Sequence, residues 1–325
     1  MDLSLIIPCH NEAGNIHPFA KRVLECMGEA DAPQTLELIF VDDGSSDGTF
    51  AKVLQLIEGG LSPRISVEGI ELSRNFGKEA AMLAGLEHAQ GSMVGFIDAD
   101  LQQDPAISFQ MFAYLAAHPQ TDCVAAVQEE RREGRVLKWF KHRFYKAFNA
   151  VGDVELPANA SDFRVFRRNV AEALLSMPEY FRFSKGLFAW VGFNTHTIPY
   201  TPAERHAGDT SWSFRKLMGY ALGGIVSFTT WPLRLILYLG LLTSLISVIY
   251  LIVVLFEYLI VGINVPGYPT LVCLILLFFG IVMLALGIFG EYLGRIYIEG
   301  KRRPVYIARR TVNQPSDDLR PEERS

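Results

Sequence analysis

The sequence predicts an α/β domain with a mostly parallel sheet, followed by two transmembrane helices. Residues 1–130 alternate short apolar runs with stretches of helical spacing, which is typical of a parallel sheet covered by helices on both faces. Nearer the C-terminus, Glu257 is the only charged residue between Arg234 and Glu291. A membrane span needs about 20 apolar residues, so this stretch is long enough for two spans. It also explains why 50% of the 325 residues are hydrophobic.

Hydrophobic periodicity defines the elements of the first domain. Short apolar runs between polar turns predict strands over Leu3–Ile7, Leu36–Val41, Ile65–Leu72, Met93–Ile97 and Cys123–Val127. Apolar residues at helical spacing predict helices over Ile16–Met27, Thr49–Ile57, Lys78–Ala89 and Ala106–Ala117. Ligands bind beyond the carboxyl ends of parallel strands, so the polar residues that follow the strands are the functional candidates.

Composition excludes several classes of protein. The hydrophobic content excludes a disordered chain, and the net charge of −5 argues against a nucleic-acid-binding protein, which is normally basic. The four cysteines have no C-x-x-C spacing, which fits a reducing cytoplasm and no metal cluster.

The uncharged stretch predicts spans near residues 235–260 and 269–290, joined by a turn rich in glycine and proline. A buried helical hairpin of a soluble protein is the alternative, but both runs exceed the ~18 residues that indicate a membrane helix. Basic residues flank the spans and none lies in the turn, so the positive-inside rule places both termini and the first domain in the cytoplasm. The flanking residues are Arg215, Lys216, Arg234, Arg295, Lys301, Arg302, Arg303, Arg309 and Arg310.

The predicted organisation has four parts: a soluble domain over 1–210, an interfacial helix over 211–232, a transmembrane hairpin over 233–291 and a basic cytoplasmic tail over 292–325. The basic segment 292–310 is expected to face lipid phosphates. Glu291 and Arg295 lie four residues apart on one helix face and are expected to pair. The motif Gly290-x-x-x-Gly294 is compatible with a homo-oligomer and equally with packing between the two spans.

Acidic clusters follow three of the predicted strands. Asn11 and Glu12 follow the first, the segment Asp42-Asp43-Gly44-Ser45-Ser46-Asp47-Gly48 follows the second, and Asp98-Ala99-Asp100 follows the fourth. Asp47 is predicted to cap the next helix. Asp98 and Asp100 leave their strand as alternate residues, so both can reach one hard cation. Mg²⁺ prefers few carboxylates together with phosphate oxygens, so this pair implies a diphosphate ligand.

Two common nucleotide sites are excluded, because the chain has neither a P-loop motif nor any G-x-G spacing. A carboxylate can instead accept a hydrogen bond from a base N–H. Asp42 or Asp43 is well placed for that role.

These motifs carry a family resemblance. Asn11-Glu12, Val41–Thr49 and Asp98–Gln102 resemble family 2 glycosyltransferases with a GT-A fold, a Rossmann-like, mostly parallel α/β fold. Further segments are similar to polyprenyl-phosphate glycosyltransferases, most closely the bactoprenol glucosyltransferases of O-antigen (lipopolysaccharide) modification. Those segments are Leu72–Glu79, Asp162–Arg164, Lys185–Gly192, Ala203–Arg205 and Gly290–Tyr297.

The resemblance implies a role for individual residues. Asp98 and Asp100 would hold Mg²⁺ or Mn²⁺ at the diphosphate, with Arg205 on phosphate oxygens, and Asp162 would lie at the reacting centre as a base or an orienting carboxylate. The groups implied around the UDP-sugar are Pro8, Asn11, Glu12, Asp42, Asp43, Lys78, Asp98 and Gln102. The sequence departs from the family at Ser211, where relatives often carry a lysine.

The acceptor requires a positive site at the membrane. Residues 131–146 hold seven basic residues interleaved with aromatic residues, which predicts a basic amphipathic helix on an anionic bilayer. A solvated surface helix is the alternative. Arg131 and Arg135 are the predicted ligands of the acceptor phosphate.

The implied function is an inverting, metal-dependent transfer of a sugar from a UDP-sugar to undecaprenyl phosphate at the bacterial inner membrane. Glucose is the favoured sugar, while UDP-N-acetylglucosamine, an aminoarabinose derivative and GDP-mannose are alternative donors. A processive polysaccharide synthase would need more spans and a Q-x-x-R-W segment, which the chain lacks. An inactive nucleotide-sugar sensor is disfavoured because the acidic clusters are intact.

Overall fold

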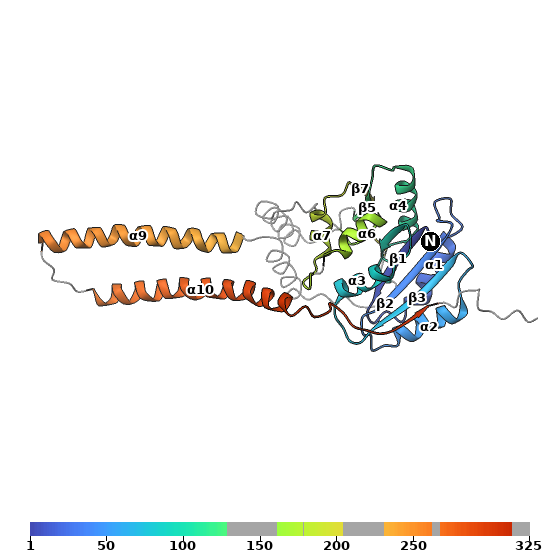
Figure 1. Cartoon of the computed structure of the whole chain (residues 1–325), viewed down its shortest axis with the longest axis horizontal. Coiled ribbons are helices and arrows are strands. Elements are labelled where there is room, and N and C mark those ends of the chain that lie inside the picture. Colours follow the sequence, from blue (N-terminus) through green and yellow to red (C-terminus); the bar gives the residue numbers. More distant parts are fainter. Residues whose placement is uncertain (129–160, 178, 204–230, 262–266, 314–325) are drawn as a thin grey trace, which may run out of the picture.

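A computed structural model describes residues 1–128, 161–177, 179–203, 231–261 and 267–313. An α/β domain holds the N-terminal elements, and two long helices extend from it side by side (Figure 1). The helix predicted near 131–146 lies outside the described residues, as does the interfacial helix predicted over 211–232 except for residues 231 and 232, which begin the first long helix.

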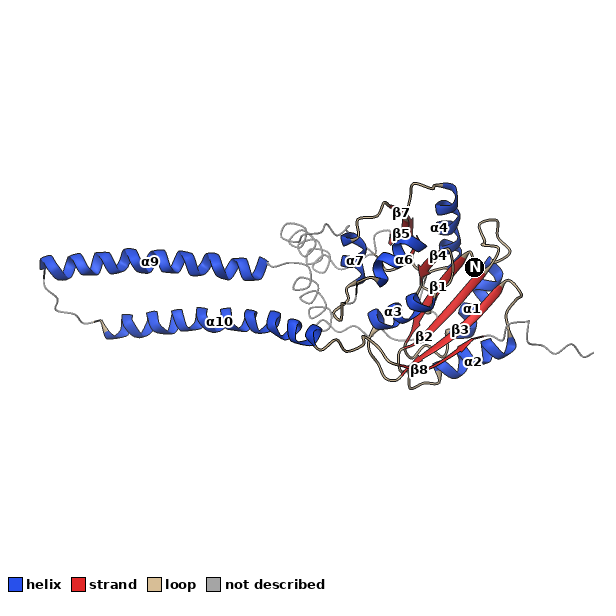
Figure 2. Cartoon of the chain, viewed as in Figure 1, coloured by secondary structure: helices blue, strands red, loops and turns tan. Residues whose placement is uncertain are grey.

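In the described residues, eight strands form one sheet with the order β7-β5-β6-β4-β1-β2-β3-β8 (Figure 2). The strands are β1 (Leu3–Cys9), β2 (Leu36–Asp42), β3 (Ile65–Leu72), β4 (Met93–Phe96), β5 (Cys123–Gln128), β6 (Arg164–Arg167), β7 (Thr195–Tyr200) and β8 (Ala308–Asn313). The pairs β4-β1, β1-β2, β2-β3 and β5-β7 are parallel, whereas β6 and β8 run antiparallel to their neighbours. The predicted mostly parallel sheet is confirmed.

Helices cover both faces of this sheet. They are α1 (Ile16–Cys26), α2 (Thr49–Gly59), α3 (Lys78–His88), α4 (Pro105–Ala117), α6 (Arg168–Leu175) and α7 (Ser184–Trp190). On β1, Leu5 and Ile7 bury against α1, α2 and α4, while Ile6 buries against α3, α6 and α7. Alternate side chains of a strand point to opposite faces, so both faces require apolar cover. This explains why the strands read as continuous apolar runs.

The two C-terminal helices are α9 (Trp231–Val261) and α10 (Tyr268–Gly300). Both are long and apolar enough to cross a membrane, and both contain a stretch with none of its residues buried in the protein. A 33-residue helix is about 50 Å long, which exceeds the ~30 Å hydrocarbon core of a bilayer. The helix ends at Gly300, ten residues past the predicted end of the second span. The predicted ion pair of Glu291 and Arg295 is confirmed, with a distance of 3.2 Å between Arg295 Nε and Glu291 Oε1.

The division into a soluble domain over 1–210, a hairpin over 233–291 and a basic tail over 292–325 stays a prediction, but the described part of that tail contains two ordered elements. Within that tail, α10 runs on to Gly300, and β8 then returns to the domain and pairs with β3. The expectation that the basic tail faces lipid phosphates is wrong for two of its arginines. Arg309 Nη1 and Arg310 Nε contact the two carboxylate oxygens of Glu71 at 3.0 and 2.6 Å. The positive charges of Arg309 and Arg310 therefore pair with a carboxylate of the neighbouring strand.

A buried carboxylate of β3 pairs with the histidine that ends α3. His88 Nδ1 lies 2.6 Å from Glu68 Oε1, and this hydrogen bond raises the pKa of His88. A raised pKa in the folded state stabilises the protein below the pKa of the unfolded histidine, about 6.5, and this contribution is lost as pH rises through the folded value. We expect His88→Gln to lower the melting temperature most near pH 6 and progressively less towards pH 9. Melting curves of both proteins across this range test it, with the exposed His17→Gln as control. A difference independent of pH would contradict it.

Candidate functional site

The loops that follow β4, β1 and β2 leave the carboxyl ends of three neighbouring strands. Cys9, the last residue of β1, is in register with Asp42, the last residue of β2. The amide of Asn11 donates to Ser45 Oγ at 2.8 Å, and the amide of Ser46 donates back to Asn11 Oδ1 at 2.9 Å. The amide of Glu12 donates to Thr49 Oγ1 at 2.9 Å. Asn11 and Glu12 therefore fasten the loops after β1 and β2 together.

Asp47 lies in the same junction but is not the predicted helix cap. The N-cap residue of α2 is Gly48, and Asp47 instead bridges the loops by accepting from the amides of Thr49 and Ala13 at 3.0 and 3.1 Å. Burial alone would raise the pKa of Asp47, but hydrogen bonds from the Thr49 hydroxyl and these amides lower it. Asp47 is therefore an ionised structural group.

Asp42 and Asp43 have different partners. The two carboxylate oxygens of Asp43 accept from the amides of Phe76 and Gly77 at 2.6 and 2.8 Å, so this buried side chain holds the loop before α3. Asp42 Oδ1 accepts from the amide and hydroxyl of Ser45, and burial raises the pKa of Asp42. The contacts of Asp43 are explained by the fold, so Asp42 is the stronger candidate of the two for a base contact.

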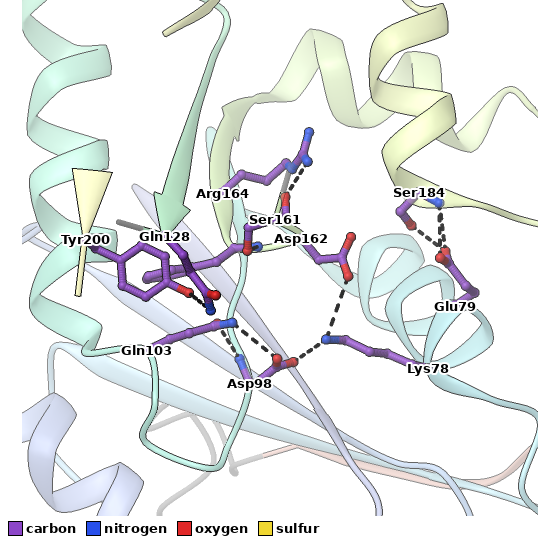
Figure 3. Close-up of polar contacts among 11 residues, drawn as sticks. Lys78, Glu79, Asp98, Gln103, Gln128, Ser161, Asp162, Arg164, Ser184 and Tyr200 are labelled. Atoms are coloured by element: carbon purple, nitrogen blue, oxygen red, sulfur yellow. Dashed lines mark hydrogen bonds and ion pairs between the residues drawn. The ribbon is translucent and has the colours of Figure 1, made fainter. Parts of the chain in front are cut away.

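The centre of the site is a cluster of Lys78, Asp98, Gln103 and Asp162 (Figure 3). Lys78 Nζ lies 2.5 Å from Asp98 Oδ1 and 3.9 Å from Asp162 Oδ2. The cluster lies beside Pro8 of β1. Lys78 opens α3, Asp98 follows β4 and Asp162 precedes β6, so three elements distant in sequence supply the cluster.

Gln103 fixes the orientation of Asp98. Its side-chain oxygen accepts from the Asp98 amide at 3.0 Å, and its side-chain nitrogen donates to Asp98 Oδ2 at 3.2 Å. The neighbouring Asp100 is buried, and its Oδ1 accepts from the Gln102 amide at 3.1 Å. The carbonyl of Gln102 accepts from the Ala203 amide at 3.2 Å. Gln103 was missed from the sequence, although it directly follows the recognised Asp98–Gln102 segment.

Asp162 is an anion among cations. Burial alone would raise its pKa, but Lys78, Lys185 and Arg164 together lower it. In the described part of the chain, its buried Oδ1 has no hydrogen-bond partner. Loss of solvation would lower the pKa of Lys78, whose side chain is 40% exposed, but the charges of Asp98 and Asp162 raise it. The cluster is therefore charged, and the side of Asp162 without a partner suits a hydrogen-bond donor on a ligand.

Glu79 ties this cluster to α7. Its carboxylate accepts from the amide of Ser184 at 3.1 Å and also from the Ser184 hydroxyl (Figure 3). Burial, followed by the nearby negative charge of Asp162, raises the pKa of Glu79. The contact fixes the start of α7, where Lys185 follows Ser184. Neither Glu79 nor Lys185 was assigned a role from the sequence, because a contact across 105 residues has no local signature.

The arrangement fits a divalent cation. Two carboxylates, of Asp98 and Asp100, follow one strand, and an ammonium group already contacts Asp98, so the site is built to hold positive charge. Among the described residues, no group of three or more His, Cys, Asp or Glu side chains could hold a metal ion. Two carboxylates suit Mg²⁺ or Mn²⁺ when phosphate oxygens and water complete the coordination. The predicted phosphate ligands Arg131, Arg135 and Arg205 lie outside the described residues, as does Ser211.

Comparison with known proteins gives consistent matches. The model of the family described as glycosyl transferase family 2 matches residues 4–175. The chain is 39% identical over 321 residues to the putative glycosyltransferase CsbB of Bacillus subtilis, covering 98% of this chain and 94% of that one. It is 39% identical over 313 residues to the prophage bactoprenol glucosyl transferase homolog of Escherichia coli, covering 95% and 99%. Among solved structures, mannosyl-3-phosphoglycerate synthase from Rubrobacter xylanophilus matches with 18% identity and a TM-score of 0.46, covering 69% and 72%.

Proposed function

The chain belongs to glycosyl transferase family 2, and from this premise we propose that it transfers glucose from UDP-glucose to undecaprenyl phosphate. The observation that carries the proposal is the similarity over nearly the whole length to bactoprenol glucosyl transferases, including both apolar helices. The domain has the mostly parallel sheet of the GT-A fold, with the acidic residues at its strand ends. The product is a glucosyl-phosphoryl-undecaprenol.

The chemistry requires stabilisation of a leaving diphosphate. Negative charge builds on the β-phosphate of UDP as the glycosidic bond breaks. A divalent cation held by Asp98 and Asp100 would supply Lewis-acid stabilisation of that charge. Lys78 contacts the carboxylate of Asp98 and can donate a charge-assisted hydrogen bond to the diphosphate. Arg205 remains a predicted second phosphate ligand.

The acceptor needs little help from a base. A phosphate monoester has a second pKa of about 6 and is mostly a dianion at pH 7. Asp162 has a lowered pKa and is ionised, so its role here is to orient the reacting groups by accepting a hydrogen bond. Direct attack by the phosphate on the anomeric carbon inverts it, so an α-linked donor gives a β-linked product.

The membrane arrangement follows from the nature of the acceptor. Undecaprenyl phosphate is held in the bilayer, so the catalytic domain works at the membrane surface. We place it, together with both termini, on the cytoplasmic face of the bacterial inner membrane, where basic residues flank the spans. Arg131 and Arg135 are the proposed ligands of the acceptor phosphate.

A donor panel tests the proposal. The detergent-purified protein is incubated with undecaprenyl phosphate, Mg²⁺ and, in turn, UDP-glucose, UDP-N-acetylglucosamine and GDP-mannose, and the lipid is analysed by mass spectrometry. We expect a hexosyl lipid from UDP-glucose with release of UDP, and a β linkage by NMR. Preference for another donor would change the sugar. Transfer only to a protein or a soluble glycan would overturn the acceptor.

A further inference from the structure

We propose that Lys78 occupies the position of the divalent cation at Asp98 in the donor-free enzyme, so that cation and lysine compete for this carboxylate. The inference rests on the proposed function, because it assumes that Asp98 helps to hold the cation. It adds an order of binding, in which firm binding of the cation requires the nucleotide diphosphate. The contact that carries it is the 2.5 Å distance from Lys78 Nζ to Asp98 Oδ1.

The Asp98 carboxylate has little freedom to bind the Lys78 ammonium group and a divalent cation at the same time. Its Oδ2 accepts from Gln103 Nε2, and its own amide donates to Gln103 Oε1, so the carboxylate is held in one orientation. The remaining oxygen, Oδ1, points at Lys78 (Figure 3). A divalent cation that binds Oδ1 must displace the ammonium group or accept its repulsion at contact distance.

The charges explain why the nucleotide diphosphate determines whether Lys78 or the cation binds Asp98. Lys78 faces the carboxylates of Asp98 and Asp162, at 2.5 and 3.9 Å, so one ammonium group offsets two negative charges. A UDP-sugar brings two further negative charges on its phosphates. These charges can accept the ammonium of Lys78, which leaves Asp98 Oδ1 to the cation. Lysine suits such a movement, because its ammonium group is a point charge on a flexible stem.

Direct measurement of Mn²⁺ binding tests the competition without any catalytic turnover. Mn²⁺ is titrated into the detergent-purified full-length protein, with and without UDP, and free Mn²⁺ is followed by EPR. Without UDP, we expect Lys78→Ala to bind Mn²⁺ about 10-fold more tightly than wild type, within the usual range of coupling between two ligands. With UDP present, this gain should disappear, because the diphosphate has already withdrawn the lysine.

Matched variants separate competition from a general change of charge. Lys185→Ala removes another cation that acts on Asp162 and, within the described part of the chain, forms no ion pair with Asp98, so it should tighten Mn²⁺ binding much less than Lys78→Ala. Lys78→Arg keeps a cation beside Asp98 and should bind Mn²⁺ as weakly as wild type. Melting curves confirm that each variant is folded.

The result that overturns the proposal is equal or weaker Mn²⁺ binding by Lys78→Ala without UDP. An equal gain in Lys185→Ala also overturns it, because the effect would then be one of net charge. These outcomes leave the proposed function standing, since glucosyl transfer is tested separately by the donor panel. Absence of Mn²⁺ binding by wild type, even with UDP, would overturn both the competition and the metal-dependent reaction.

Discussion

Asp98→Ala and Asp100→Ala should each lower glucosyl transfer to undecaprenyl phosphate by a factor on the order of 10² to 10³, the usual loss when one contact to a developing charge is removed. Both residues follow β4, and Asp98 contacts Lys78 while Asp100 accepts from the Gln102 amide. Their carboxylates are the proposed ligands of the cation that stabilises the leaving UDP. The measurement is the initial rate with UDP-glucose and Mg²⁺, followed as glucosyl lipid.

Loss of activity is informative only if the fold persists. The exposed Glu58→Ala is the matched control, because it removes a carboxylate from the end of α2, a helix that supplies no member of the Lys78 cluster, and it should keep wild-type rates. The melting temperatures of the aspartate variants should lie close to that of wild type. More than a tenth of the wild-type rate in either aspartate variant would contradict the metal-dependent mechanism, and full activity would revive a role as a nucleotide-sugar sensor.

Gly44→Ala should destabilise the domain by about 3 kcal/mol and weaken UDP binding, because both the backbone conformation of Gly44 and the backbone atoms next to it exclude a Cβ. Gly44 has a φ of +64°, where a side chain costs about 1–2 kcal/mol. A Cβ here would lie 2.5 Å from the carbonyl carbon of Arg74 and 2.6 Å from the nitrogen of Asn75. Backbone atoms cannot rotate away, so the loop before α3 must shift and Asp43 loses its amides. Melting curves and calorimetric titration with UDP measure the two effects.

Gly48→Ala is the matched control for this prediction. Gly48 also has a positive φ, of +85°, but no atom of the described residues lies within 4 Å of an added Cβ. It should therefore carry only the conformational cost. We expect Gly44→Ala to lower the melting temperature by about 10 °C and Gly48→Ala by less than half of that. Equal losses would show that the close approach to Arg74 has no energetic weight.

Most of the central sheet could be predicted from sequence, because its strands are buried on both faces and read as apolar runs. The edge elements could not. β8 has the sequence Ala-Arg-Arg-Thr-Val-Asn and is almost entirely exposed, so it carries no hydrophobic pattern. Its partner β3 lies over 230 residues earlier in the chain, so the pairing has no local signal in the sequence. The ion pair between Arg310 and Glu71 explains a basic residue of β8 only after the strands are seen side by side.

The site shows the same division. The placement of Asp98 and Asp100 directly after a buried strand could be predicted, whereas their role as metal ligands stays a proposal. The function of Asp43 could not be separated from that of Asp42, because its partners are the backbone amides of Phe76 and Gly77 and leave no trace in side-chain type. The approach of Lys78 to Asp98 and Asp162 depends on tertiary packing alone.

The return of the chain from α10 into the sheet limits how the enzyme can meet its lipid. Seven residues join Gly300 to Ala308, a tether of at most about 25 Å. The carbonyl of Ile307 accepts from the amide of Ser73, just before the loop that leads to Lys78. We therefore expect a tilt of α10 to act, through this short connection, on the loop that precedes Lys78. Because bilayer thickness influences the tilt of a spanning helix, it is expected to influence the position of the donor site relative to the membrane surface.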